Sequence, residues 1–351
     1  MTAHRWFNEY HAKQKGNVKS GGSRATENTP QLQFVAAFCA GLTLHLLSSS
    51  LKEMGVIGDI KDTVSKAVFT PSSLLSGRGG LHMAQMLLSV VTFVLGALRG
   101  GSSHTYWNYA MFTWAFCPIM TLVITIIEMF KLDIVLNMFC MDWSDFTTGM
   151  AMSSALMTVS VAITYANFYV CRTCLYGWIV SISAFLCALV YTLEVVKDKF
   201  LDKKKGSYLA ALPGFWKVME AFVSCMIFIS LTGYRDKPAL ILCVIAYAIP
   251  FPILPLIIAT NILKKLKTCL PFNLDRFVFI FLVISVVLYI FAAIMWPIFM
   301  FRNNPRPSEC PPSFCIWAIQ FMVAFFTYVN LILFTLDLIF TLLGIFNFKR
   351  T

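Results

Sequence analysis

The sequence has few charged residues and no pattern typical of a catalytic or cofactor site. Only 13% of its 351 residues are Asp, Glu, Lys or Arg, whereas 58% are hydrophobic, and the mean hydropathy is +0.73. No nucleophile motif or phosphate-binding loop is present. The histidines lack the paired spacing of metal ligands; they are His4, His11, His45, His82 and His104. We therefore expect no enzyme activity, no cofactor and no metal ion.

Long apolar runs account for most of the chain, and about 20 apolar residues are enough to cross a bilayer as a helix. Eight segments meet this requirement, in two groups of four separated by a lysine-rich linker at residues 197–205. We predict an all-α integral membrane protein with eight transmembrane helices in two four-helix bundles. The predicted spans are residues 81–99, 109–130, 148–170, 176–196, 214–233, 238–263, 277–301 and 314–345.

Three regions follow from this pattern. Residues 1–75 form a basic amino-terminal extension, and the two bundles occupy residues 76–200 and 201–351. Within the extension, residues 32–51 are apolar but are interrupted by Gln33, His45 and a run of serines. This segment is a helix lying in the interface, a weakly ordered extension or a ninth span. The first two alternatives are favoured, because a ninth span would place the basic residues before it outside.

The positive charge predicts an orientation. Of the 28 Lys and Arg residues, 22 fall in the termini and connections on one side of the eight spans and six on the other. Cytoplasmic loops are enriched in Lys and Arg, so we expect both termini to be cytoplasmic. The basic residues behind the net charge of +11 lie in short clusters at span ends. They therefore indicate the orientation of the protein in the membrane, and we expect no nucleic-acid partner. Anionic lipid of the inner leaflet is the expected partner of Lys203, Lys204, Lys205, Lys264, Lys265 and Lys267.

The cysteines outside the apolar runs fall into two groups. Four lie on the side opposite the termini, where disulfides form, either within each loop or between the two halves: Cys171, Cys174, Cys310 and Cys315. Cys140 and Cys269 lie in loops on the cytoplasmic side, where they are either acylated or remain unmodified thiols.

Polar and aromatic residues of the spans have structural explanations. The acidic residues Glu128, Glu194, Glu220 and Asp337 lie towards the cytoplasmic ends, where anchoring and helix pairing are expected rather than a proton or cation pathway. Lys217 precedes Glu220 by three residues, which favours an ion pair. Aromatic residues near span ends are expected to anchor the protein at the lipid headgroups; they include Tyr106, Trp107, Trp143, Trp178, Trp216, Trp296 and Trp317.

The span at residues 238–263 contains Pro250, Pro252 and Pro255, which predict a kink because each removes a backbone donor. Broken helices line the substrate sites of many transporters. The alternative function is therefore a secondary transporter or channel, although the other half lacks a matching interruption.

Several segments resemble the myeloid-associated differentiation marker family. They are Tyr109–Cys117, Tyr191–Val195, Gly206–Glu220 and Lys237–Leu240, and the resemblance covers about residues 71–349. It implies tandem MARVEL domains, each a four-helix membrane bundle, and no catalytic residues. It further implies a location in ordered, raft-like domains of the plasma membrane and in trafficking vesicles, with cholesterol-rich lipid around the protein. A role in cell spreading and at junctions is also implied. The expected protein partners are further copies of this chain or other membrane proteins, in homo- or hetero-oligomers. The first 70 residues depart from the family pattern.

Overall fold

The computed structural model describes residues 77–99, 105–133, 136, 142–171, 175–198, 212–231, 237–263, 273–302, 304–307 and 315–348. All regular secondary structure within these ranges is helical. The apolar segment at residues 32–51 and the linker at 199–205 lie outside them. The predicted limits of the amino-terminal extension and of the two domains therefore stay predictions.

Eight helical spans are long and apolar enough to cross a membrane, which confirms the predicted fold class. The first four are α4 (Gly77–Leu98), α5 (Thr105–Met129), α7 (Trp143–Tyr169) and α8 (Leu175–Val196). The second four are α9 (Leu212–Ser230), α10 (Pro238–Ala248) continued by α11 (Pro250–Ile262), α13 (Leu274–Phe301) and α14 (Ile316–Phe348).

Some helices begin a few residues before the apolar runs that predicted them. The side chain of Asp142 accepts a hydrogen bond from the Asp145 N–H (3.2 Å) at the start of α7. Asn273 does the same for the Asp275 N–H (3.2 Å) at the start of α13. These polar caps satisfy orphan backbone donors, so the helix extends beyond its hydrophobic portion.

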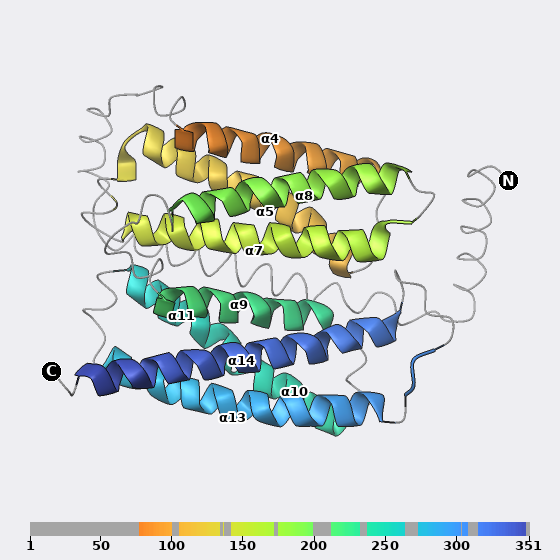
Figure 1. The fold of residues 1–351 in the computed structure, drawn as a ribbon, viewed down its shortest axis with the longest axis vertical. Helices are drawn as coiled ribbons and strands as arrows, with labels where there is room; N and C mark the ends of the chain where they lie inside the picture. The colour runs from red at the N-terminus through yellow and green to blue at the C-terminus, as the bar shows by residue number, and fades with distance from the viewer. Residues whose placement is uncertain are drawn as a thin grey trace.

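The helices run roughly parallel to one line and fall into two groups, with α4, α5, α7 and α8 above and α9, α10, α11, α13 and α14 below (Figure 1). In the first bundle, α4 and α7 each pack against α5 and α8. In the second bundle, α14 packs against α9 and α13, α10 against α13, and α11 against α9. The two bundles meet where α9 packs on α7 and α5 and where α11 touches α7. The predicted division into two four-helix bundles is confirmed, and the bundles share an interface.

Aromatic rings fill the interior of both bundles. Trp114 and Tyr165 lie in the first core, and Tyr247, Tyr289 and Trp296 lie in the second, all nearly inaccessible to solvent. Residues of α9 belong to the first core cluster, so the apolar interior continues from one bundle into the other.

The prediction that aromatic residues near span ends are headgroup anchors is wrong for most of them. Tyr106, Trp107, Trp143 and Trp296 are buried between helices, whereas Trp178 is 49% exposed. The Trp296 indole N–H donates to the Gln320 carbonyl (3.3 Å), which satisfies its polar group inside the bundle. Position along a span does not determine which side of the helix a ring occupies.

The predicted kink divides the sixth span at Ile249. This residue keeps helical dihedral angles (φ −71°, ψ −52°), and its N–H donates to the Ile245 carbonyl (3.2 Å). The chain therefore changes direction without forming a loop. The part before the kink packs on α13, whereas the part after it packs mainly on α9 and also reaches α7. The Asp142 N–H donates to the Ile262 carbonyl (2.9 Å), which ties the end of this span to the first bundle.

Candidate functional site

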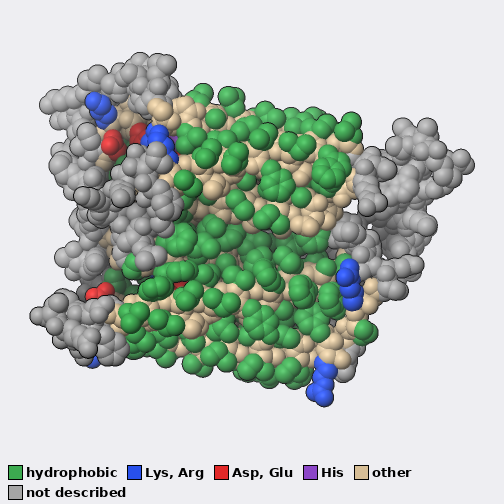
Figure 2. All heavy atoms as spheres, viewed as in Figure 1, with side chains coloured by type: hydrophobic (Ala, Val, Ile, Leu, Met, Phe, Trp, Pro, Cys, Tyr) green, Lys and Arg blue, Asp and Glu red, His purple; other side chains and the backbone are tan. Residues whose placement is uncertain are grey.

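The largest chemical feature of the surface is its apolar belt, which covers most of the visible face between the two ends of the bundles (Figure 2). Large hydrophobic side chains of most spans are exposed there. On α13 these side chains are mostly β-branched: Ile280, Val283, Ile284, Val287, Ile290, Ile294 and Ile298. On α8 they include more leucine and aromatic residues, namely Leu175, Tyr176, Trp178, Phe185, Leu186, Leu189 and Leu193.

Charge is distributed unevenly between the two ends of the helices. Every acidic residue that the structure describes lies at or near the end at which α4 begins and α14 finishes, called the acidic end below: Glu128, Asp133, Asp142, Asp145, Glu194, Asp198, Glu220, Asp275 and Asp337. The described part of the opposite end, called the basic end, carries only cations: Arg99, Lys237, Arg302 and Arg306.

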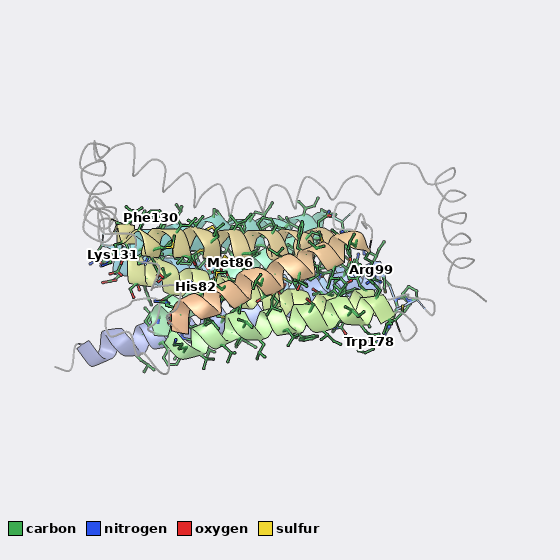
Figure 3. The ribbon with its side chains drawn as sticks, turned by 90° about the horizontal axis from the view of Figure 1, so that it is seen from above. His82, Met86, Arg99, Phe130, Lys131 and Trp178 are labelled. Carbon is green, nitrogen blue, oxygen red and sulfur yellow. The ribbon has the colours of Figure 1, made fainter. Side chains whose placement is uncertain are left out.

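A buried polar cluster joins α4 to α8 in the first bundle. His82 Nε2 lies 2.9 Å from Glu194 Oε1, and Gln85 Nε2 donates to Glu194 Oε2 (2.8 Å). His82 Nδ1 lies 3.1 Å from the Thr125 hydroxyl of α5. Arg78, at the start of α4, pairs with Asp198 beyond the end of α8 (2.8 Å). Figure 3 shows His82 near one end of α4 and Arg99 beyond its other end.

A second buried cluster joins α9 to α14 in the second bundle. The Lys217 ammonium donates to Asp337 Oδ2 and lies 3.4 Å from Glu220 Oε2. All three side chains are almost completely buried, and Glu220 Oε1 has no hydrogen-bond partner among the residues that the structure describes. The predicted pair of Lys217 with Glu220 is confirmed. Sequence spacing did not reveal its second partner, Asp337, because that residue lies on another helix.

The two clusters have the same arrangement along the first helix of each bundle. In α4 a buried serine, Ser89, follows His82 and Gln85 and contacts Cys187 (3.2 Å) and Tyr191 (3.5 Å) of α8. In α9 the buried Ser224 contacts Tyr289 (3.3 Å) of α13 and accepts from Asn330 (2.9 Å) of α14. The spacing His82, Gln85, Ser89 equals the spacing Lys217, Glu220, Ser224.

A small polar cavity adjoins the first cluster, with room for roughly one water molecule. It is lined by charged and hydroxyl-bearing residues and by four apolar residues: Arg78, His82, Glu194, Thr121, Thr147, Ser154, Tyr191, Met120, Ile124, Met150 and Ala151. It lies among α4, α5, α7 and α8 towards the acidic end. The polar part of this lining and the small volume suit a hydrogen-bonded water rather than an apolar ligand.

Cations at the basic end rest on aromatic rings. The Arg99 guanidinium donates to the Tyr165 hydroxyl (2.7 Å) and lies over the rings of Tyr165 and Tyr169. Arg306 lies over Trp317 in the same way. These contacts hold the charges at the edge of the belt.

Of the residues predicted from the sequence to be functional, two are described. Cys171 and Cys315 are both disulfide-bonded. Cys174 and Cys310 lie outside the described residues, so the predicted pairing stays a prediction. The same holds for Cys140 and Cys269 and for the lysines Lys203, Lys204, Lys205, Lys264, Lys265 and Lys267. Within the described ranges, no three His, Cys, Asp or Glu side chains are grouped as a metal site.

Sequence reasoning missed the cluster around His82. The signal was present, because His82, Gln85, Ser89 and Thr92 recur at three- and four-residue intervals and so occupy one face of an otherwise apolar helix. A polar stripe on a transmembrane helix indicates a buried contact with a neighbouring helix.

Comparison with known proteins finds relatives along most of the chain. A Xenopus laevis protein named myeloid-associated differentiation marker-like protein 2 is 33% identical over 296 residues, which are 80% of this chain and 97% of the relative. The human protein of that name is 30% identical over 278 residues, 74% of this chain and 89% of the relative. Human myeloid-associated differentiation marker is 31% identical over 291 residues, 78% of this chain and 89% of the relative. No protein-family profile and no solved structure matches.

Proposed function

Because the chain belongs to the myeloid-associated differentiation marker family, we propose that this multi-pass membrane protein has no catalytic activity and organises ordered, raft-like domains of the plasma membrane. It acts in vesicle trafficking, in cell spreading and at cell junctions. The observation that carries the proposal is the β-branched outer face of α13, whose side chains are exposed on the apolar belt.

A β-branched face suits rigid lipid for a physical reason. Val and Ile have essentially one χ1 rotamer in a helix, so they lose little side-chain entropy when a neighbour packs against them. A sterol ring system is likewise stiff, and the contact of two stiff surfaces requires little ordering on either side. Leucine keeps more rotamers and gives a less uniform surface. Cholesterol-rich lipid is therefore the proposed partner of α13.

Partitioning of the full-length protein between ordered and disordered phases of plasma-membrane vesicles tests this proposal. The variant Ile284→Leu/Ile290→Leu/Ile294→Leu keeps the hydrophobicity of α13 and removes its β-branching. We expect the unmodified protein to favour the ordered phase and this variant to shift towards the disordered phase. The matched control is Leu186→Ile/Leu189→Ile/Leu193→Ile on α8, whose side chains are similarly exposed. Equal partitioning of all three proteins would refute the proposal.

The acidic end is proposed to face the cytoplasm. The predicted topology assigns 22 of the 28 Lys and Arg residues to this side, and the positive-inside rule outweighs the acidic residues, which contribute little to orientation. An epitope tag at each terminus tests the orientation in intact cells. Both tags are expected to be inaccessible to antibody until the plasma membrane is permeabilised, and labelling of either one without permeabilisation would reverse or reject this topology.

Lipid contacts of the cytoplasmic loops extend the proposal. The six lysines at 203–205, 264, 265 and 267 are proposed to bind anionic inner-leaflet lipid, each contributing about 1 kcal/mol near the surface. Cys140 and Cys269 are the proposed acylation sites. Reconstitution with and without phosphatidylserine tests the first contact: lipid that co-purifies with the protein should be enriched in phosphatidylserine, and replacing the six lysines with glutamine should abolish the enrichment.

A further inference from the structure

The hydrogen bonds around His82 fix where its ring protons lie. The Thr125 hydroxyl donates its only hydrogen to the Thr121 carbonyl, 2.7 Å away. With its hydrogen placed there, this hydroxyl accepts from His82, and we assign a hydrogen to His82 Nδ1, 3.1 Å away. A neutral imidazole has one N–H, and that hydrogen is now assigned to Nδ1.

The other ring nitrogen faces a carboxyl oxygen. Nε2 of His82 lies 2.9 Å from Oε1 of Glu194, a distance that requires a hydrogen between them. An ionised carboxylate is an acceptor only, and a second hydrogen on the ring makes it an imidazolium. The alternative is a neutral ring with the hydrogen on Glu194. In both arrangements the pair holds one proton more than a neutral histidine beside an ionised glutamate.

We propose that His82 and Glu194 form a proton-binding site between α4 and α8. The ligand is a single proton, shared between Nε2 and Oε1 and exchanged with water. Without it, the Nε2 lone pair would face the carboxylate directly, so binding of the proton maintains the polar contact between the first and fourth helices of the bundle. Both side chains are nearly buried, which makes an uncompensated charge there costly.

The polar cavity gives this proton a route. It is lined by His82 and Glu194 themselves and by Arg78, whose side chain is 31% exposed at the acidic end. A water in the cavity has several hydroxyl partners, among them Thr121, which also contacts the Tyr191 hydroxyl (3.3 Å). The site thus adjoins a cavity that reaches a partly exposed residue, as proton exchange with water requires.

The charged and titratable groups around His82 and Glu194 do not replace the proton that this pair binds. Arg78 on α4 is matched by Asp198, and the remaining titratable group lining the cavity is Tyr191 on α8. The faces of α5 and α7 that line the cavity carry only hydroxyl and apolar side chains: Met120, Thr121, Ile124, Thr147, Met150, Ala151 and Ser154. Among the residues that the structure describes, Arg78 is the only other charged side chain of the lining, and it is paired with Asp198, so the cation in direct contact with Glu194 is the bound proton.

Solid-state NMR of the full chain in lipid bilayers, labelled with ¹⁵N-histidine, tests the site. Protonated and bare ring nitrogens give well-separated signals, and a His82→Asn sample identifies those of His82 by their loss. Near neutral pH we expect two protonated nitrogens for His82. In a Glu194→Gln sample, one of these N–H signals should be lost and replaced by a bare nitrogen.

Infrared spectroscopy of the same samples detects the alternative arrangement, in which the proton is on Glu194. A bare Nε2 in the unmodified protein, together with a carboxylic-acid band that Glu194→Gln removes, places the proton on Glu194 and supports the site equally. A bare ring nitrogen together with an ionised Glu194 in the unmodified protein overturns the proposal. This decisive measurement uses the unmodified protein, so it does not depend on whether a variant folds.

Discussion

Lys217 in the second bundle is the counterpart of His82 in the first. Each lies in the early part of the first helix of its bundle, and each pairs with the acidic residue of the fourth helix, Asp337 or Glu194. The residue three positions later also takes part in each cluster. In both halves, a polar contact therefore joins the first and fourth helices at the same position, but different side chains form it.

Removing the Lys217 ammonium should strongly destabilise the second bundle. Lys217→Met leaves Glu220 and Asp337 buried without a cation, and breaking a buried pair in this way typically costs about 3–5 kcal/mol. Thermal unfolding in a fixed detergent or lipid mixture measures the effect. Asp275→Asn, at an exposed position, is the control and should change stability by less than about 0.5 kcal/mol.

A compensating variant separates charge from packing. In Lys217→Met/Glu220→Gln/Asp337→Asn no ionised group remains in the cluster, and the side-chain volumes are nearly kept. Most of the stability lost in Lys217→Met should return, because the unpaired charges are gone. If the triple variant is as unstable as the single one, the ion pair is not the source of the loss.

Sequence reasoning predicted the spans well, but it did not predict which side chains point into the bundles or which helices they contact. Apolar length identified all eight crossings, and the three prolines predicted the kink, because both signals are local in the chain. The inward direction of Trp296 depends on where α10 and α14 lie, which no local pattern contains. His82 and Glu194 are 112 positions apart, so their contact arises only when α4 packs on α8.

A close approach between α4 and α5 depends on Gly96. A Cβ atom at this position would lie 2.8 Å from Cζ3 of Trp114, a buried ring that cannot move aside. Gly96→Ala should therefore destabilise the protein by about 1–3 kcal/mol. Gly80→Ala, on the same helix with open space around it, should be neutral or stabilising by up to about 1 kcal/mol. Equal melting temperatures for the two variants would contradict this account.

The cysteines should separate into two chemical groups. Cys171 and Cys315 are disulfide-bonded, whereas Cys117, Cys187 and Cys243 are free thiols within the spans. Alkylation after unfolding without reductant should modify all of the second group and neither of the first. Mass spectrometry of the linked peptides then identifies the partners and decides between pairing within each loop and pairing across the halves. Modification of Cys171 or Cys315 before reduction would contradict the prediction.

The kink at Ile249 should determine whether α11 reaches the first bundle. Pro250→Ala/Pro252→Ala restores two backbone donors, which favours a straighter span. A straighter span carries α11 away from α7, so the distance between spin labels at Ser144 and Asn261 should increase. Labels at Ser144 and Val196, both in the first bundle, provide the control distance and should not move. An unchanged distance between Ser144 and Asn261 would show that packing alone sets the bend.

A hydrogen bond between Tyr106 and Ser230 should help to hold the two bundles together. Their hydroxyl oxygens are 2.8 Å apart, and Ser230 donates to the Met226 carbonyl (2.8 Å), so Tyr106 is the donor between α5 and α9. With a protease site introduced at residues 199–205, cleavage separates the chain into halves whose association can be measured by co-purification. Loss of one such bond costs about 1 kcal/mol, so Tyr106→Phe should weaken association about fivefold.

The matched control is the bond from Tyr109 to Ser160, also 2.8 Å, which lies wholly within the first bundle. Ser160 donates to the Met157 carbonyl (2.9 Å), so Tyr109 is again the donor, and the two bonds have the same chemistry. Tyr109→Phe should lower the stability of its own bundle and leave association of the halves unchanged. If both variants weaken association equally, the effect comes from general loosening of α5, and Tyr106 has no special part in joining the bundles.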